Sequence, residues 1–237
     1  TYRGRLIGTT HGYAFASGLE PDAVRSEMGP RLRDLWKEAG GSFAMAALAV
    51  DGPAPAVVRG WQESDFAFRD VVSSEHYRSV FTGDGHPNMN AVLLHYLGMV
   101  NAVDLLFPYV HDVEDEAEQY AIFKMRFVLT AHVVGSLRKL AGEGRSFSAS
   151  SAAHLQHLVD AVPEGSLLSL QWLRNLLVHY APNSKSDPSK AHGVPLLNGV
   201  LAVSETSRSL EEVAAGTTRN LRHLSKGLGD WMEAPSV

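Results

Sequence analysis

Residues 113–144 read VEDEAEQYAIFKMRFVLTAHVVGSLRKLAGEG, and this stretch decides the fold class. Acidic residues fill its first turns, whereas Arg138 and Lys139 lie near its end, just ahead of Gly142 and Gly144. Negative charge at a helix N-terminus and positive charge at its C-terminus both interact favourably with the helix dipole, and glycine is common just past a helix end. The stretch therefore predicts a long helix.

The segments on either side predict further helices. Residues 88–107, NMNAVLLHYLGMVNAVDLLF, predict an apolar helix that ends ahead of Pro108, because proline cannot continue a helix. A shorter helix is expected at 148–162, and another is expected to open at Pro163 and to carry residues 173–182. These helices follow one another along the chain, which is typical of a bundle.

The C-terminal part continues the helical pattern after a break. Residues 181–200 are polar and contain three prolines, which predicts a loop. Residues 207–232 predict a last helix, weakened by Gly216. The fold class expected from these patterns is mainly α, with a helical bundle over residues 87–235.

The first part of the chain, residues 1–82, has a different character. Residues 20–39 have helical spacing, but Gly29 and Pro30 interrupt it, and residues 42–61 read as two short strands around a turn. We therefore expect a mixed N-terminal attachment, α/β or a β-hairpin, that precedes the bundle.

Composition limits the kinds of function. The chain has 237 residues, a net charge of -5 and no cysteine, which excludes disulfides, zinc–thiolate sites and cysteine nucleophiles. The acidic balance argues against a broad nucleic-acid coat but permits a local basic site. The first 15 residues are too polar for a signal peptide and no apolar run reaches 18 residues, so we expect a cytoplasmic protein without a membrane partner.

The stretch LRNLLVHYAP, residues 173–182, sets polar residues into an apolar helix. Asn175 and His179 are four residues apart and share one helix face, whereas Arg174 and His179 are about 140° apart around the axis. Two interpretations stay open at this point. The three side chains could simply be paired with neighbouring acids and carbonyls, or they could be held in place for chemistry.

The pattern Arg-Asn-x-x-x-His, in an apolar helix of a helical bundle, resembles the signature of the HEPN superfamily. Many members of that superfamily are metal-independent endoribonucleases. The resemblance implies that Arg174, Asn175 and His179 are catalytic, that no cofactor or metal is needed, and that two copies form a homodimer with one composite active site. It also implies a toxin or antiviral defence effector, with a cognate antitoxin or regulatory partner.

The residue types suit cleavage of RNA by its own 2′-OH. An unperturbed imidazole titrates near neutral pH, so His179 can move protons there. The planar guanidinium of Arg174 can stabilise the extra charge on the phosphate, and Asn175 can orient either group. The candidates for further contacts with the RNA are Trp172, Tyr180, Lys124 and Arg126. For the two basic residues, an alternative interpretation is a pair of charges on the solvated face of their helix.

Other polar residues carry weaker signals. His154 and His157 have a spacing compatible with a metal site. No glutamate completes a metalloprotease motif there and Asp160 is the only nearby acid, so surface or capping histidines are expected. His132 falls in an apolar stripe, which predicts a buried imidazole rather than a groove residue. Arg219 with His223 lacks one position of the motif, which indicates a solvated helix face.

Two other functions fit the same sequence. The bundle could be a non-catalytic HEPN-like module that binds a nucleotide, RNA or a protein. It could also be a plain helical interaction protein in which the motif occurs by chance.

Overall fold

The computed structural model describes most of the chain from residue 73 onward and a short N-terminal segment. The described residues are 1, 3–9, 65, 67, 73–82, 86–142, 147–162, 170–179, 187–204 and 207–234. Within these ranges the chain is mainly helical and contains no strand, so the α class is confirmed. The strands expected at 42–61 and the broken helix expected at 20–39 lie outside the described residues.

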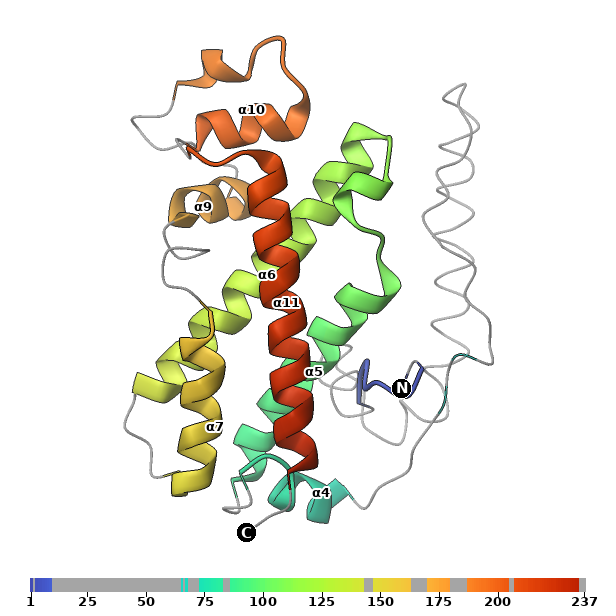
Figure 1. The fold of residues 1–237 in the computed structure, drawn as a ribbon, viewed down its shortest axis with the longest axis vertical. Helices are drawn as coiled ribbons and strands as arrows, with labels where there is room; N and C mark the ends of the chain where they lie inside the picture. The colour runs from blue at the N-terminus through green and yellow to red at the C-terminus, as the bar shows by residue number, and fades with distance from the viewer. Residues whose placement is uncertain are drawn as a thin grey trace.

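Three long helices form the centre of the bundle (Figure 1). They are α5 (Pro87–Leu106), α6 (Glu116–Gly142) and α11 (Leu210–Glu233), and each packs against the other two. The helices predicted from the apolar runs and the charge order are therefore confirmed.

Local sequence explains where two of these helices begin. Pro87 lies in the first turn of α5, where its missing N–H leaves no intrahelical bond unmade. At the start of α11 the Ser209 hydroxyl accepts from the Glu212 N–H, and the Glu212 carboxylate accepts from the Ser209 N–H. Gly216 does not break α11, because burial of one helix face stabilises the helix more than a single glycine weakens it.

Shorter helices cover this centre. α7 (Ala149–Asp160) packs on α6 and α11, and α9 (Gln171–His179) packs on α6. α4 (Ser73–Ser79) packs on α5, and the 3-10 turn η3 (Val110–Asp112) packs on α6. In Figure 1, α9 lies toward the end of the bundle opposite α4 and the C-terminus.

The prediction of a loop over residues 181–200 is wrong for part of this range. The range contains the 3-10 turn η5 (Pro188–Ala191) and the start of α10 (Leu196–Val203). The run LLNGVLAV forms a helix after the polar segment because Leu197 and Leu201 are buried in the core.

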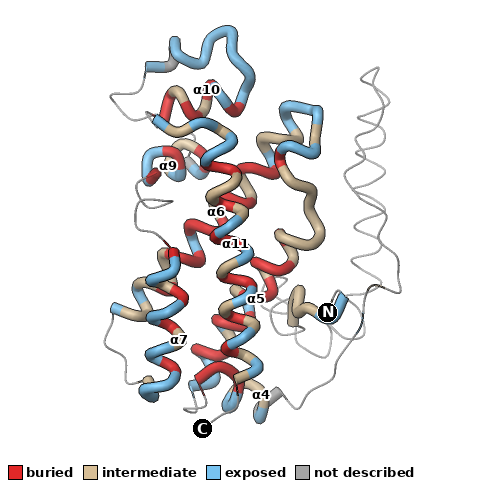
Figure 2. Tube along the Cα trace, in the orientation of Figure 1, coloured by how far each residue is buried: buried red, intermediate tan, exposed pale blue. Residues whose placement is uncertain are grey.

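The core consists of two apolar clusters, one toward each end of the bundle (Figure 2). The first joins α5, α6, α7 and α11 around residues that include Leu97, Val133, Leu158, Leu224 and Trp231. The second joins α6, α9, α10 and α11 around residues that include Phe123, Phe127, Leu173, Leu177 and Leu201. α6 and α11 contribute residues to both clusters, so α7 in the first cluster and α9 in the second pack on the same helices.

α5 is apolar as well as long. By length and composition alone, the stretch Pro87–Asp112 is long and apolar enough to cross a membrane. In the structure Leu93, Leu94 and Leu97 are buried in the first cluster, and α5 packs against α4, α6 and α11. Core packing therefore accounts for much of its apolar composition.

The N-terminal segment 3–9 lies against α5 (Figure 1). The Asn101 amide donates to the Leu6 carbonyl oxygen over 2.8 Å. A Cβ added at Gly98 would lie only 3.2 Å from the backbone nitrogen of Gly8, so the glycine on α5 permits this close approach. This contact places the N-terminal segment 3–9 beside the polar residue Asn101 of α5.

Candidate functional site

α9 presents the predicted catalytic motif from a firmly packed helix. Leu173 and Leu177, one helical turn apart, are fully buried in the second cluster. Arg174 is exposed beside them, and the residue Trp172 is 52% exposed. An arginine in solvent on an anchored helix is available to a phosphate group.

The structure describes Asn175 in full and only the backbone of His179. Asn175 is half-buried on α9. His179 is the last residue of α9, but its side chain lies outside the described features, and Tyr180 lies outside the described residues. The structure thus places Arg174 and Asn175 on one helix and places the backbone of His179 at its end.

The two basic candidates on α6 differ from each other. Lys124 is half-buried, and its ammonium lies 5.9 Å from the centre of the Tyr120 ring. Arg126 is 2% exposed, so its interpretation as a solvated charge is wrong. Its guanidinium donates to the carbonyl oxygens of Val103 and Phe107, over 3.2 and 2.9 Å, at the end of α5. Arg126 therefore holds α6 to the end of α5 and is not displayed to a ligand at the surface.

Several histidines make ring contacts in the described part of the chain. His154 stacks on Trp231 with 5.7 Å between ring centres. No group of three or more potential metal ligands occurs among the described residues. The prediction that His132 is buried is wrong, because it is exposed, with its ring edge-on to Tyr96 at 5.9 Å.

The pair Arg219 and His223, on α11, was predicted to lie on a solvated helix face, and this face is only partly solvated. Arg219 is exposed as expected, but Asn220 is buried. The His223 ring lies 6.3 Å from the His157 ring, and burial, followed by the charge of His157, lowers the pKa of His223.

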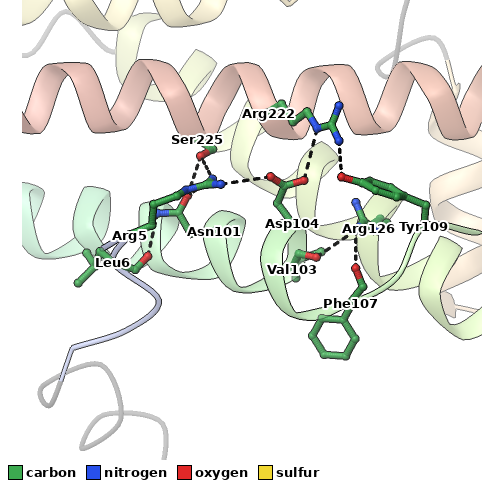
Figure 3. A network of polar contacts seen from close by, with 10 residues as sticks. All are labelled: Arg5, Leu6, Asn101, Val103, Asp104, Phe107, Tyr109, Arg126, Arg222 and Ser225. Carbon is green, nitrogen blue, oxygen red and sulfur yellow. Dashed lines mark hydrogen bonds and ion pairs between the residues drawn. The ribbon is translucent and has the colours of Figure 1, made fainter. Parts of the chain in front are cut away.

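Sequence reasoning missed a polar network at the centre of the bundle (Figure 3). The Asp104 side chain, on α5, is 8% exposed and lies between two arginines from distant parts of the chain. Its Oδ2 is 3.5 Å from Nη1 of Arg5, and its Oδ1 is 3.7 Å from Nε of Arg222. Within the described residues Oδ1 accepts no hydrogen bond.

A second set of bonds fixes Arg5 in this network. Its guanidinium donates to Oδ1 of Asn101 over 2.7 Å and to the hydroxyl of Ser225. The Ser225 hydroxyl in turn donates to Asn101 Oδ1 over 2.6 Å. The N-terminal segment, α5 and α11 are thereby joined through one buried amide.

Tyr109 lies between two guanidinium groups. The ring centre is 4.8 Å from the Arg126 guanidinium carbon and 5.1 Å from that of Arg222. Arg222 also donates to the Tyr109 hydroxyl, and this bond raises the pKa of Arg222. Burial lowers the pKa of Arg126, with Asp104 opposing that effect.

This network forms one wall of a cleft of about 560 Å³. The lining comes from the N-terminal segment, α5 and α11, and includes Arg5, Asn101, Asp104, Arg222, Lys226 and Gly229. A sequence signal did exist, because Asn101 and Asp104 are polar residues three apart in an otherwise apolar helix. Their partners are far away in sequence, so the spacing alone does not reveal the cleft.

The described part of the chain is thus a helical bundle with an exposed arginine on α9 and a polar cleft between α5 and α11. No protein-family model, curated protein or solved structure matches the chain.

Proposed function

We propose that the chain is a metal-independent endoribonuclease of the HEPN type, with its active site on α9. The observation that supports this proposal best is the placement of Arg174. It is exposed on a helix whose neighbouring Leu173 and Leu177 are fully buried, so its backbone is fixed while its guanidinium reaches solvent. Transfer of a phosphoryl group requires a cation that is held in place beside the phosphate.

Each motif residue has a role in the proposed reaction. The RNA 2′-OH attacks the adjacent phosphorus, and the bond to the 5′-oxygen of the next nucleotide breaks. His179 transfers protons between these two oxygens, and Arg174 stabilises the additional negative charge on the phosphate. Asn175 orients the imidazole or the phosphate. The products are a 2′,3′-cyclic phosphate and a free 5′-OH.

The proposed active form is a homodimer in the cytoplasm. Two copies of α9 across a two-fold axis double the positive charge at one groove, which the net charge of -5 of the chain does not supply. Such an enzyme acts as a toxin or an antiviral defence effector, and a cognate antitoxin or another regulatory partner restrains it.

An arginine substitution with a matched control tests the proposal. Arg174→Ala removes the exposed guanidinium of α9, whereas Arg219→Ala removes an exposed guanidinium of α11 that also precedes an asparagine. RNA cleavage in EDTA is expected to fall by about 100-fold or more in Arg174→Ala and to change little in Arg219→Ala. Equal activity of the two variants contradicts the proposal.

The alternative is a non-catalytic HEPN-like module. In that case the wild-type protein binds RNA, a nucleotide or a partner protein without cutting RNA, and Arg174→Ala weakens binding rather than cleavage. Measuring RNA retention beside cleavage separates the two functions.

A further inference from the structure

Trp172 is the most exposed large hydrophobic residue in the described part of the chain, at 52%. Val178, on the same helix, is 37% exposed, so α9 carries two of the five exposed residues of this kind that the structure describes. With the other described residues, the indole of Trp172 makes no hydrogen bond and no ring contact. An indole in solvent on a helix that buried neighbours hold in place is available to another aromatic group.

The helical period places Trp172 at one edge of the exposed face of α9 and Arg174 at the other. With about 100° per residue, the two positions are about 160° apart on the side away from the buried leucines. Asn175 and the backbone position of His179 fall between them, about 60° and about 20° from Trp172. The exposed face therefore has a cation at one edge, an aromatic ring at the other and the remaining motif positions between them.

A nucleotide has the chemistry that fits this face. Its phosphate is anionic and suits a guanidinium, and its base presents a flat π surface that stacks on an indole. α9 contains no acidic residue, although the whole chain has a net charge of -5, so a phosphate meets no carboxylate from this helix. An apolar protein partner would account for Trp172 and Val178 but would make no use of the guanidinium of Arg174 at the other edge.

We propose that Trp172 stacks on the base of the nucleotide next to the scissile phosphate, while Arg174 holds that phosphate. This inference rests on the proposed nuclease site of α9 and adds its substrate class, which is RNA whose base beside the cut is unpaired. Within a duplex that base is stacked between its neighbours, so both of its faces are covered. Every base has a π face, so the contact selects unpaired RNA without selecting one base.

Removal of single bases from the RNA tests this contact. A single-stranded RNA that the wild type cuts at one position is prepared with one abasic nucleotide at each position in turn. Cleavage is expected to fall by about tenfold when the missing base is next to the cut and to change little when it is farther away. A cleavage rate that is equally sensitive to every position, or to none, overturns the proposal.

The same RNA series, cut by variants of Trp172, assigns the stacking to this residue. Trp172→Ala is expected to cut the intact RNA about tenfold more slowly and to lose no further activity when the base next to the cut is missing. Trp172→Phe keeps an aromatic ring and should recover most of the rate. Leu196→Ala removes an exposed apolar side chain from α10 and should cut as the wild type does. Independent losses from Trp172→Ala and from the missing base contradict the contact.

Binding of an RNA that cannot be cut separates this inference from the nuclease itself. An RNA with 2′-O-methyl groups has no 2′-OH to attack the phosphate, so it reports binding alone. It is expected to quench the tryptophan fluorescence of the wild type to saturation and to quench that of Trp172→Phe much less. Absence of any quenching that depends on Trp172 overturns the base contact, whether or not ordinary RNA is cut. Quenching that depends on Trp172, without cleavage of ordinary RNA, overturns the nuclease alone.

A second copy of the chain is the other group that could cover Trp172. Sedimentation velocity of the wild type and of Trp172→Ala, at matched concentrations, decides between the two. The same oligomeric state is expected in both proteins, because the indole contacts RNA and not the partner copy. Dissociation of a wild-type dimer in Trp172→Ala would show that the indole packs against the second copy and would overturn the proposal.

Discussion

The guanidinium of Arg126 lies 4.8 Å from the centre of the Tyr109 ring, in the turn that joins α5 to α6. The same guanidinium donates to the carbonyl oxygens of Val103 and Phe107. The last carbonyls of a helix have no intrahelical donor, so Arg126 supplies donors at the end of α5 from the neighbouring helix. This contact fixes how α5 and α6 meet.

Replacing Arg126 is expected to destabilise the bundle. Arg126→Met keeps much of the volume but removes the donors to the two carbonyl oxygens, so the free energy of unfolding should fall by about 1–3 kcal/mol. Urea denaturation measures the change, with the exposed Arg219→Met as the control. An unchanged midpoint in Arg126→Met would mean that the cost of burying the charge offsets the stabilisation by its hydrogen bonds.

The close packing of α7 on α11 is tested by a pair of glycines. A Cβ at Gly227 would lie 2.3 Å from Cδ2 of Leu158, which is buried and has little room to move. Gly227→Ala should therefore destabilise the protein, whereas Gly229→Ala should stabilise it by about 0.5–1 kcal/mol through helix propensity. The two thermal midpoints should move in opposite directions. Stabilisation by both substitutions contradicts the packing described for α7.

Periodicity and charge order predicted the long helices because these signals are local. The acidic start and basic end of 113–144 mark α6 correctly, and Pro87 marks the start of α5. The sequence did not predict α10, because proline-rich polar residues precede it. The run LLNGVLAV forms a helix because it is buried against η5, α6, α9 and α11.

The residues of the candidate sites also differ in whether the sequence predicts them. The α9 motif was visible because its residues are close together in the sequence. The cleft was not, because Asn101 bonds Arg5 across 96 positions and Ser225 across 124. The exposure of residues on α6 also depends on partners elsewhere in the chain. Arg126 is therefore buried, although the sequence predicts either a contact with RNA or a charge on the solvated face of the helix.

The free energy of unfolding should decrease as the pH is lowered, because His223 becomes protonated. Its pKa is lowered in the folded state from an ordinary value of 6.5, so the unfolded chain takes up the proton first as pH falls. This destabilising contribution is absent well above pH 6.5 and grows as the pH falls toward the pKa of the folded state. Among the described residues, the groups that act on the pKa of this imidazole are His157, the Leu158 backbone and Lys226.

Urea denaturation between pH 7.5 and 5.5 measures this effect. The wild type should lose more free energy of unfolding over this interval than His223→Gln, which has no proton to gain at this position. Parallel curves for the two proteins would assign the pH dependence to other groups.

The central claim is that α9 carries a nuclease site, and the ends of cleaved RNA test it most directly. End-labelled single-stranded RNA and total tRNA are incubated in EDTA with the wild type and with His179→Ala. We predict that only the wild type cuts the RNA and that the new ends are 2′,3′-cyclic phosphates. Equal cutting by both proteins, or no cutting by a folded wild-type dimer, would contradict the claim.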